Sequence, residues 1–288
     1  MYRIGILQLT QNLDDAVHGF KAELTQRGII AEFDYVNADG TIDRLPFLAA
    51  QLAKKNVDLI FACSTPAAIA AVNLPENIPV VFTPVFDPVG AKLANSMEKP
   101  GGKATGVAGM VKANDKIRFI KSILPQVTCL GILYHTSDTN SLAELDNFRK
   151  AAGNVSLIEI PIEASESLSN LPDLLPHAMD ALFLPIGKII EENFATIMYY
   201  SDLIQVPIIA SHAPNVPDGA LAGLFANHYQ LGQECAAKAE DILKGVLPGL
   251  IPIDTVKNPE IWLNEFTAEN LGIILPEDVK KAAVEIFE

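Results

Sequence analysis

Polar side chains that can donate or accept hydrogen bonds gather directly after the buried strands that the sequence predicts. In open parallel sheets, ligands bind beyond the carboxyl ends of the strands. Hydroxyl and amide groups are frequent at these positions, and paired carboxylates are scarce. The candidate ligand-binding residues are Gln8, Thr10, Ser64, Thr65, Thr83, Phe86, Asp87, Tyr134, Asn140, Ser141, Gly187 and Asn227. This composition favours recognition by hydrogen bonds over acid–base catalysis, so we expect no catalytic residue.

Two helix starts in this set could receive an anion. Pro66 suits the first turn of a helix, so Ser64 or Thr65 is the expected cap, and the free backbone N–H groups could bind a carboxylate. The alternative is that the hydroxyl only caps its own helix. The run 139–141 precedes another predicted helix, whose free backbone N–H groups could bind a carboxylate in the same way. Phe86 and Tyr134 could pack against an aromatic or aliphatic ligand.

Metal and nucleotide sites are not expected. His135, His212 and His228 follow predicted strands, but none has a second histidine or a cysteine two to four residues away. The sequence has no G-x-x-x-x-G-K-[ST] loop, no G-x-S-x-G elbow and no G-x-G-x-x-G after a strand. We therefore predict no metal and no cofactor.

The strongest enzyme alternative is a two-cysteine racemase. The run Ala62-Cys63-Ser64-Thr65 resembles the cysteine-bearing strand end of the aspartate/glutamate racemase family. Such chemistry needs a second thiol at the matching strand end of the other half. Cys129 instead begins its predicted strand and Cys235 lies inside a predicted helix, so this alternative is weak.

Strands and helices alternate along two successive halves, a pattern typical of βαβ units. The first half has expected strands at 3–9, 31–36, 58–62, 79–82 and 105–110 and expected helices at 14–27, 43–55 and 66–72. The second half has expected strands at 129–134, 155–161, 181–184, 208–210 and 220–225 and expected helices at 114–123, 141–152, 189–204 and 231–244; a strand at 261–266 and a helix at 276–286 follow. The predicted fold is α/β, with two doubly wound parallel-sheet lobes.

Two domains are also expected from the length of 288 residues. We place the first lobe at 1–110 with 228–255, the second at 111–227 with 256–288, and three hinge segments between them. The net charge of −14 excludes nucleic acid and anionic membrane surfaces as expected partners. No apolar run is long enough to span a membrane, and residues 2–9 already form a strand, so the protein is cytoplasmic or has lost a leader.

A family resemblance covers nearly the whole chain. The runs 83–91 (TPVFDPVGA) and 99–107 (KPGGKATGV) are similar to a signature of ABC importer substrate-binding proteins, in the family that includes aromatic-amino-acid binders. Further matches lie at 181–185, 206–211, 228–232, 242–245 and 271–276. The resemblance implies a type I periplasmic-binding-protein fold and one small-molecule ligand between the lobes. It also implies a monomer that delivers its ligand to a membrane permease, and an extracytoplasmic location after loss of a leader, in the periplasm or lipid-anchored at the cell surface.

Two departures from the family pattern bear on the ligand. Where relatives commonly show Thr-Asp-Asn, this chain has Ile186-Gly187-Lys188, and where they show Asp, it has Asn227. Both changes remove a carboxylate that could pair with an ammonium group, whose burial unpaired is costly. We therefore expect a carboxylate or an aromatic or aliphatic acid rather than a free amino acid. A sensor module that acts on a signalling partner remains the alternative outside transport.

Overall fold

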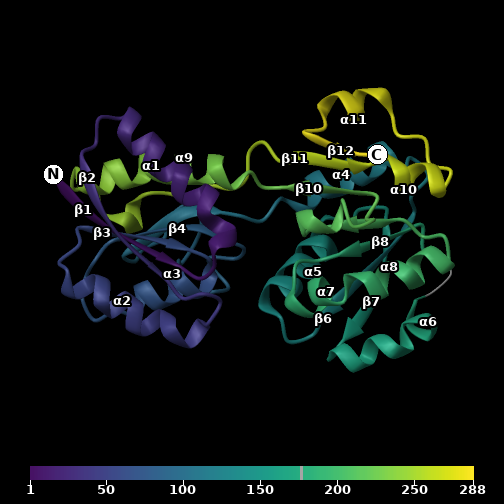
Figure 1. Cartoon of the computed structure of the whole chain (residues 1–288), viewed down its shortest axis with the longest axis horizontal. Helices are drawn as coiled ribbons and strands as arrows, with labels where there is room; N and C mark the ends of the chain where they lie inside the picture. The colour runs from purple at the N-terminus through teal and green to yellow at the C-terminus, as the bar shows by residue number, and fades with distance from the viewer. Residues whose placement is uncertain (176–177) are drawn as a thin grey trace. The chain divides into compact units, whose positions relative to one another are not determined.

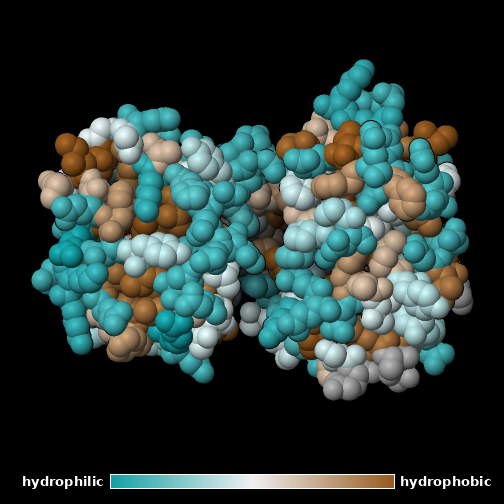
Figure 2. Space-filling model, in the orientation of Figure 1, coloured by the Kyte–Doolittle hydropathy of each residue, from teal (hydrophilic) through white to brown (hydrophobic). Residues whose placement is uncertain are grey.

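The computed structural model describes residues 1–175 and 178–288, which form two compact units (Figure 1). Unit 1 comprises Met1–Met110 and Ala226–Asn258, and unit 2 comprises Val111–Phe225 and Pro259–Glu288. The chain therefore passes between the units three times. In the view of Figure 2, hydrophilic side chains cover much of each unit, and hydrophobic ones form separate patches.

Unit 1 is built on a five-stranded parallel sheet in the order β2-β1-β3-β4-β5. Its strands are β1 (Tyr2–Gln8), β2 (Ala31–Asn37), β3 (Leu59–Cys63), β4 (Val80–Val85) and β5 (Ala104–Ala108). Its helices are α1 (Asp14–Gln26), α2 (Leu45–Lys54), α3 (Thr65–Val72) and α9 (His228–Leu243), with 3₁₀ turns η1 (Gln11–Leu13), η2 (Ile42–Arg44) and η5 (Pro248–Leu250).

Helices cover both faces of this sheet, which explains why its central strand is apolar throughout. All five residues of β3 are buried. Alternate side chains of β3 point to opposite faces. Ile60 and Ala62 pack into the core formed with α2 and α3. Phe61 stacks on Phe20 of α1 with ring centroids 4.0 Å apart.

Two glycines allow α9 to pack closely on α1. A Cβ atom at Gly19 would lie 2.0 Å from the Tyr229 carbonyl oxygen, and one at Gly232 would lie 2.0 Å from the Ala16 oxygen. Both contacts are with backbone, which cannot swing away as a side chain can. The close packing attaches a helix from the last third of the chain to the first unit.

Replacing Gly232 by alanine is expected to destabilise unit 1. Alanine favours an isolated helix by about 1 kcal/mol, but the forced separation of α9 from α1 costs more, and we expect a net loss of about 1–3 kcal/mol. Thermal unfolding measures the effect. Gly102→Ala is the matched control, because a Cβ there meets no atom within 4 Å. A Gly232→Ala protein that melts no earlier than the control would contradict the prediction.

Unit 2 is built on a seven-stranded sheet in the order β12-β11-β10-β9-β8-β6-β7. Its strands are β6 (Cys129–His135), β7 (Ser156–Ile162), β8 (Ala181–Leu184), β9 (Ile208–Ala210), β10 (Ala222–Phe225), β11 (Glu260–Asn264) and β12 (Glu285–Phe287). Its helices are α4 (Ala113–Ile123), α5 (Thr139–Ala151), α6 (Leu171–Leu174), α7 (Lys188–Glu192), α8 (Phe194–Leu203), α10 (Glu265–Asn270) and α11 (Glu277–Ala282), with 3₁₀ segments η3 (Ser165–Asn170) and η4 (Ala213–Asn215).

The predicted α/β class with parallel-sheet lobes is confirmed, with one exception in unit 2. The strands β10 and β11 pair antiparallel, so the sheet is mixed. The strand that we predicted at 261–266 ends at Asn264, whose side chain caps α10 by accepting from the Thr267 N–H. The expected terminal helix at 276–286 ends at Ala282, and its last residues form β12 beside β11.

The helix predicted at 189–204 is not continuous in the structure. It consists of α7 and α8, which meet at Asn193. Asn193 leaves the helical region of backbone space, with φ −114° and ψ 17°. Its side-chain nitrogen donates to the Ile189 carbonyl at 2.8 Å, so the side chain competes with the helical backbone for hydrogen bonds.

Candidate functional site

Three candidate strand ends lie side by side at the carboxyl edge of the unit 1 sheet. The strand register pairs Gln8 with Cys63, and Cys63 with Thr83. Gln8 and Thr83 are fully buried, and Ser64 begins the next turn by donating its N–H to the Thr83 carbonyl at 3.3 Å. Gln8, Ser64 and Thr83 therefore form a polar row at the edge where ligands bind in this class of sheet.

Two buried polar atoms of this row lack a nitrogen or oxygen partner within the described ranges 1–175 and 178–288. They are the side-chain oxygen of Gln8 and the hydroxyl of Thr83. The Gln8 amide nitrogen is satisfied, because it donates to the Asp14 carboxylate at 3.0 Å. Unpartnered buried polar groups are rare in folded proteins and require an explanation such as a function.

Ser64, rather than Thr65, is the cap of α3. Its hydroxyl accepts from the Ala67 N–H at 3.3 Å, and Thr65 is the first residue of the helix. Ser64 has a φ of 104°, a strained value for a residue other than glycine. Strain of this kind clusters at functional sites, so the geometry agrees with the placement of Ser64 at the ligand edge.

The remaining candidates of unit 1 have different surroundings. Thr10 is half-buried and makes no capping bond at the start of η1. Phe86 is half-buried directly after β4. Asp87 is exposed, and its carboxylate accepts from the Gly90 N–H at 2.8 Å. Asn227 caps α9 by accepting from the Gln230 N–H at 2.9 Å. Asp87 and Asn227 therefore each organise a local turn or helix start.

The anion site that we predicted at 139–141 is wrong. These residues lie inside α5, and the cap is Asp138, whose carboxylate accepts from the N–H groups of Asn140 and Ser141 at 2.9 Å each. The helix start thus carries its own anion. The Ser141 hydroxyl is buried and accepts from the His135 N–H at 3.1 Å, and Asn140 is half-buried.

Gly187 and Tyr134 complete the candidate set in unit 2. Tyr134 is half-buried near the end of β6. Gly187 precedes α7 and donates its N–H to the Glu191 carboxylate at 3.1 Å. Lys188, beside it, has an 82% exposed side chain whose ammonium lies 3.6 Å from Glu192. The charge of Lys188 is therefore on the surface rather than in a buried site.

Residue types and spacing did not predict a buried ionic cluster at the carboxyl edge of the unit 2 sheet. Lys116 of α4 pairs with Glu144 of α5, and their side chains are only 5% and 1% exposed. Ser211, directly after β9, donates to Glu144 at 2.7 Å and accepts from Lys116 at 2.7 Å. The second Glu144 oxygen accepts from the Ile186 N–H at 2.8 Å. The cluster therefore holds the turns that follow β8 and β9 against two helices.

One signal for this cluster exists in the sequence. Lys116 stands at helical spacing from Ile120 and Ile123, which are buried residues of the same helix. A lysine on an apolar stripe predicts a buried partner, although the sequence does not say which acid supplies it.

Asp14 was also missed. It is the first residue of α1, it is half-buried, and it contacts Gln8 of the polar row. The signal is an acid in the first helical turn after a strand end, where helix starts favour negative charge. The hydrogen bond to the Gln8 amide nitrogen places the charged Asp14 carboxylate beside the Gln8 side chain.

A family model described as ABC transporter substrate binding protein matches residues 3–287. The chain belongs to this family. The family match and its structural neighbours confirm the resemblance and the type I periplasmic-binding-protein fold that it implied. ABC substrate-binding proteins are extracytoplasmic and take a small-molecule ligand to a permease. Within the described residues, no helix combines the length and apolar character that a membrane crossing requires.

Among relatives of this family member, a tyrosine-binding protein of Clostridioides difficile (strain R20291) is 32% identical over 278 residues, or 94% of this chain and 81% of the relative. A solved structure of an ABC domain in complex with L-Trp, from Streptococcus pneumonia, is 27% identical with a TM-score of 0.82, and covers 99% of each chain. A ligand-free, open substrate-binding protein with adhesive properties, from Clostridium difficile, is 28% identical with a TM-score of 0.88, covering 100% of this chain and 99% of that one.

Proposed function

We propose that this protein is the receptor of an ABC importer and binds an aromatic L-amino acid at the carboxyl edge of the unit 1 sheet. The observation that carries the proposal concerns two buried atoms at the edge of unit 1, the side-chain oxygen of Gln8 and the hydroxyl of Thr83. Neither has a nitrogen or oxygen partner among the described residues, and the Gln8 amide nitrogen donates to Asp14. An amino acid supplies the missing groups, since its ammonium donates and its carboxylate accepts. The tyrosine-binding relative and the L-Trp complex support this ligand class.

This ligand differs from the acid without an amino group that the sequence favoured. That expectation rested on the absence of a carboxylate from the run 186–188 and from position 227. Lys188 is on the surface beside Glu192, and the Asn227 side chain caps α9. The edge of unit 1 keeps a carboxylate in Asp14, which can pair with an ammonium group.

A panel of ligands tests the proposal. We expect L-tyrosine, L-tryptophan or L-phenylalanine to raise the melting temperature, because a ligand that binds the native state stabilises it by mass action. The matched controls are 3-phenylpropionate and 3-(4-hydroxyphenyl)propionate, which keep the ring and the carboxylate but lack the amino group. Stabilisation by these acids that equals or exceeds that by the amino acids would overturn the proposal in favour of the acid ligand.

The positions and pKa values of the thiols support a binding role rather than a two-cysteine racemase. Burial raises the pKa of Cys63 and of Cys235, so both thiols stay protonated at neutral pH and are poor bases. Cys129 begins β6, at the opposite end of the strand from the ligand edge, and Cys235 lies within α9. These positions support a receptor rather than a racemase.

The oligomeric state, the cellular location and the macromolecular partners of the protein are also part of the proposal. We infer a monomer that has no nucleic-acid partner, that works outside the cytoplasm after loss of a leader, and that brings its ligand to a membrane permease. The charge of −14 supports the exclusion of nucleic acid. Size-exclusion chromatography with light scattering, with and without L-tyrosine, measures the oligomeric state.

A further inference from the structure

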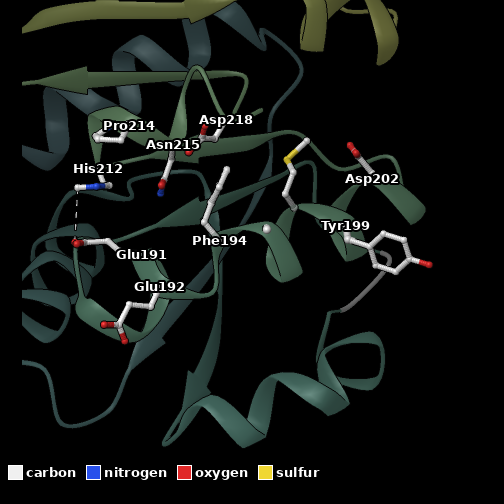
Figure 3. Close-up of a pocket in the computed structure, with 11 residues that line it drawn as sticks. Glu191, Glu192, Phe194, Tyr199, Asp202, His212, Pro214, Asn215 and Asp218 are labelled. Carbon is white, nitrogen blue, oxygen red and sulfur yellow. Dashed lines mark ion pairs between the residues drawn. The ribbon is translucent and has the colours of Figure 1, made fainter.

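A cavity lies within unit 2, along α8 and the chain that links β9 to β10. Its volume is about 670 Å³, within the range of small-molecule sites. Figure 3 shows the residues that line it. Four of them are the acids Glu191, Glu192, Asp202 and Asp218, and among the described residues of its wall none is lysine or arginine.

The wall also contains a buried side-chain nitrogen, that of Asn215, with no partner among the described residues. Asn215 is 3% exposed, and within the described part of the chain its side-chain nitrogen makes no hydrogen bond. Figure 3 shows this amide pointing into the space between the His212–Glu191 pair and Phe194. Half a turn about its last bond brings the amide oxygen to the same place, so Asn215 can either donate to a ligand or accept from one.

The charge of the cavity calls for a cation. Desolvation raises the pKa of Asp202, and no ion pair of Asp202 occurs among the described residues. Glu192 has a partner in Lys188 at 3.6 Å, but both side chains are well exposed, so this pair is weak. A positive ligand would stabilise the ionised acids without displacing a buried ion pair.

The acids and the apolar side chains are arranged in a line. Glu191 and Glu192 lie at one end, in α7, and Asp202 lies near the far end of α8. Asp202 comes eight residues after Phe194, which corresponds to about 12 Å along the helix. Met198 and Tyr199 come between Phe194 and Asp202 in the sequence of α8, and both line the cavity.

We propose that this cavity binds a linear aliphatic polyamine. Its terminal ammonium groups pair with the acids of α7 and with Asp202, and its methylene chain lies against Met198 and Tyr199. Asn215 accepts from an ammonium group along the chain. The site is separate from the proposed amino-acid site, because every residue in its wall belongs to unit 2 and none is in the polar row of unit 1.

Calorimetric titration of the full chain with spermidine at low ionic strength, in the presence of excess L-tyrosine, tests the proposal. We expect one spermidine per chain, and about tenfold or weaker binding in the variant Glu192→Gln/Asp202→Asn. The control Asp43→Asn/Glu98→Gln changes the net charge equally at exposed acids of unit 1, and is expected to bind as the parent does. Hexylamine, which has one ammonium group, is expected to bind at least tenfold more weakly than spermidine.

Any one of the following results would overturn the polyamine site. They are an absence of binding, an equal loss in the control variant, which would indicate general charge attraction, and hexylamine binding as tight as that of spermidine. Competition between spermidine and L-tyrosine would also overturn it, because the polyamine would then occupy the amino-acid site. If the amino-acid panel fails while spermidine binds with the expected variant pattern, the receptor proposal fails and the polyamine site stands.

Discussion

Replacing Lys116 by methionine is expected to lower the free energy of unfolding of unit 2 by about 3–5 kcal/mol. The change leaves the Glu144 carboxylate 1% exposed without its ammonium partner, and removes the hydrogen bond from Lys116 to Ser211. It also removes the cation from above the Phe183 ring, whose centroid lies 5.1 Å away. The loss is large because a buried charge that has lost its partner keeps its full desolvation cost.

Urea denaturation followed by tryptophan fluorescence measures this effect. The chain has one tryptophan, Trp262, which lies in β11 of unit 2, so the signal reports on that unit. The control is Lys150→Met, which breaks an exposed ion pair with Asp146 and is expected to cost less than about 1 kcal/mol.

The double variant Lys116→Met/Glu144→Gln extends the test to the pair itself. We expect it to lose less stability than the sum of its two single variants, since the second change removes the charge that the first left unpaired. A Lys116→Met protein as stable as Lys150→Met, or strictly additive single variants, would contradict a coupled buried pair.

Replacing Asp14 by asparagine is expected to weaken binding of an aromatic L-amino acid by about 2–3 kcal/mol, a factor of 30 to 140. Asparagine keeps an oxygen that can accept from Gln8 but loses the charge that pairs with an ammonium group. Isothermal titration measures the dissociation constant. Asp15→Asn is the control, because this neighbouring side chain is 79% exposed.

A ligand without the amino group separates a lost charge pair from a disturbed site. Binding of 3-(4-hydroxyphenyl)propionate is expected to change less than threefold in Asp14→Asn, since this ligand has no ammonium group to lose its partner. Equal weakening of the amino acid and the acid would show that Asp14 acts through the shape of the edge. Equal weakening by Asp15→Asn would remove Asp14 from the ligand site.

Local pattern predicted the strands and helices that have a strong period or a clear boundary. The strand at 181–184 has the predicted bounds, because its four apolar residues stand between Asp180 and Pro185, two residue types that strands disfavour. α9 ends close to the predicted residue, since Gly245 adopts a φ of 100° that favours glycine. The break at Asn193 and the short β12 were missed, because a side-chain bond and a neighbouring strand decide them.

The candidate site divides in the same way. Strand ends are visible in the sequence, so Gln8, Ser64 and Thr83 were found as candidates before the register placed Gln8 and Thr83 beside Cys63. The sequence did not predict which hydrogen bonds each of these side chains makes. Asp138 rather than the run 139–141 provides the cap of α5, because a carboxylate one residue earlier reaches the same N–H groups.

The sequence by itself determined the α/β class, the repeated halves and the family of this protein, because these follow from apolar periodicity and from motifs that are local in the chain. The tertiary structure alone decided which polar groups are satisfied. Lys116 and Glu144 are 28 residues apart, and Ser211 is a further 67 residues away. Such partners meet only when the sheet brings its strand ends together, and their hydrogen bonds determine which side chains remain available to a ligand.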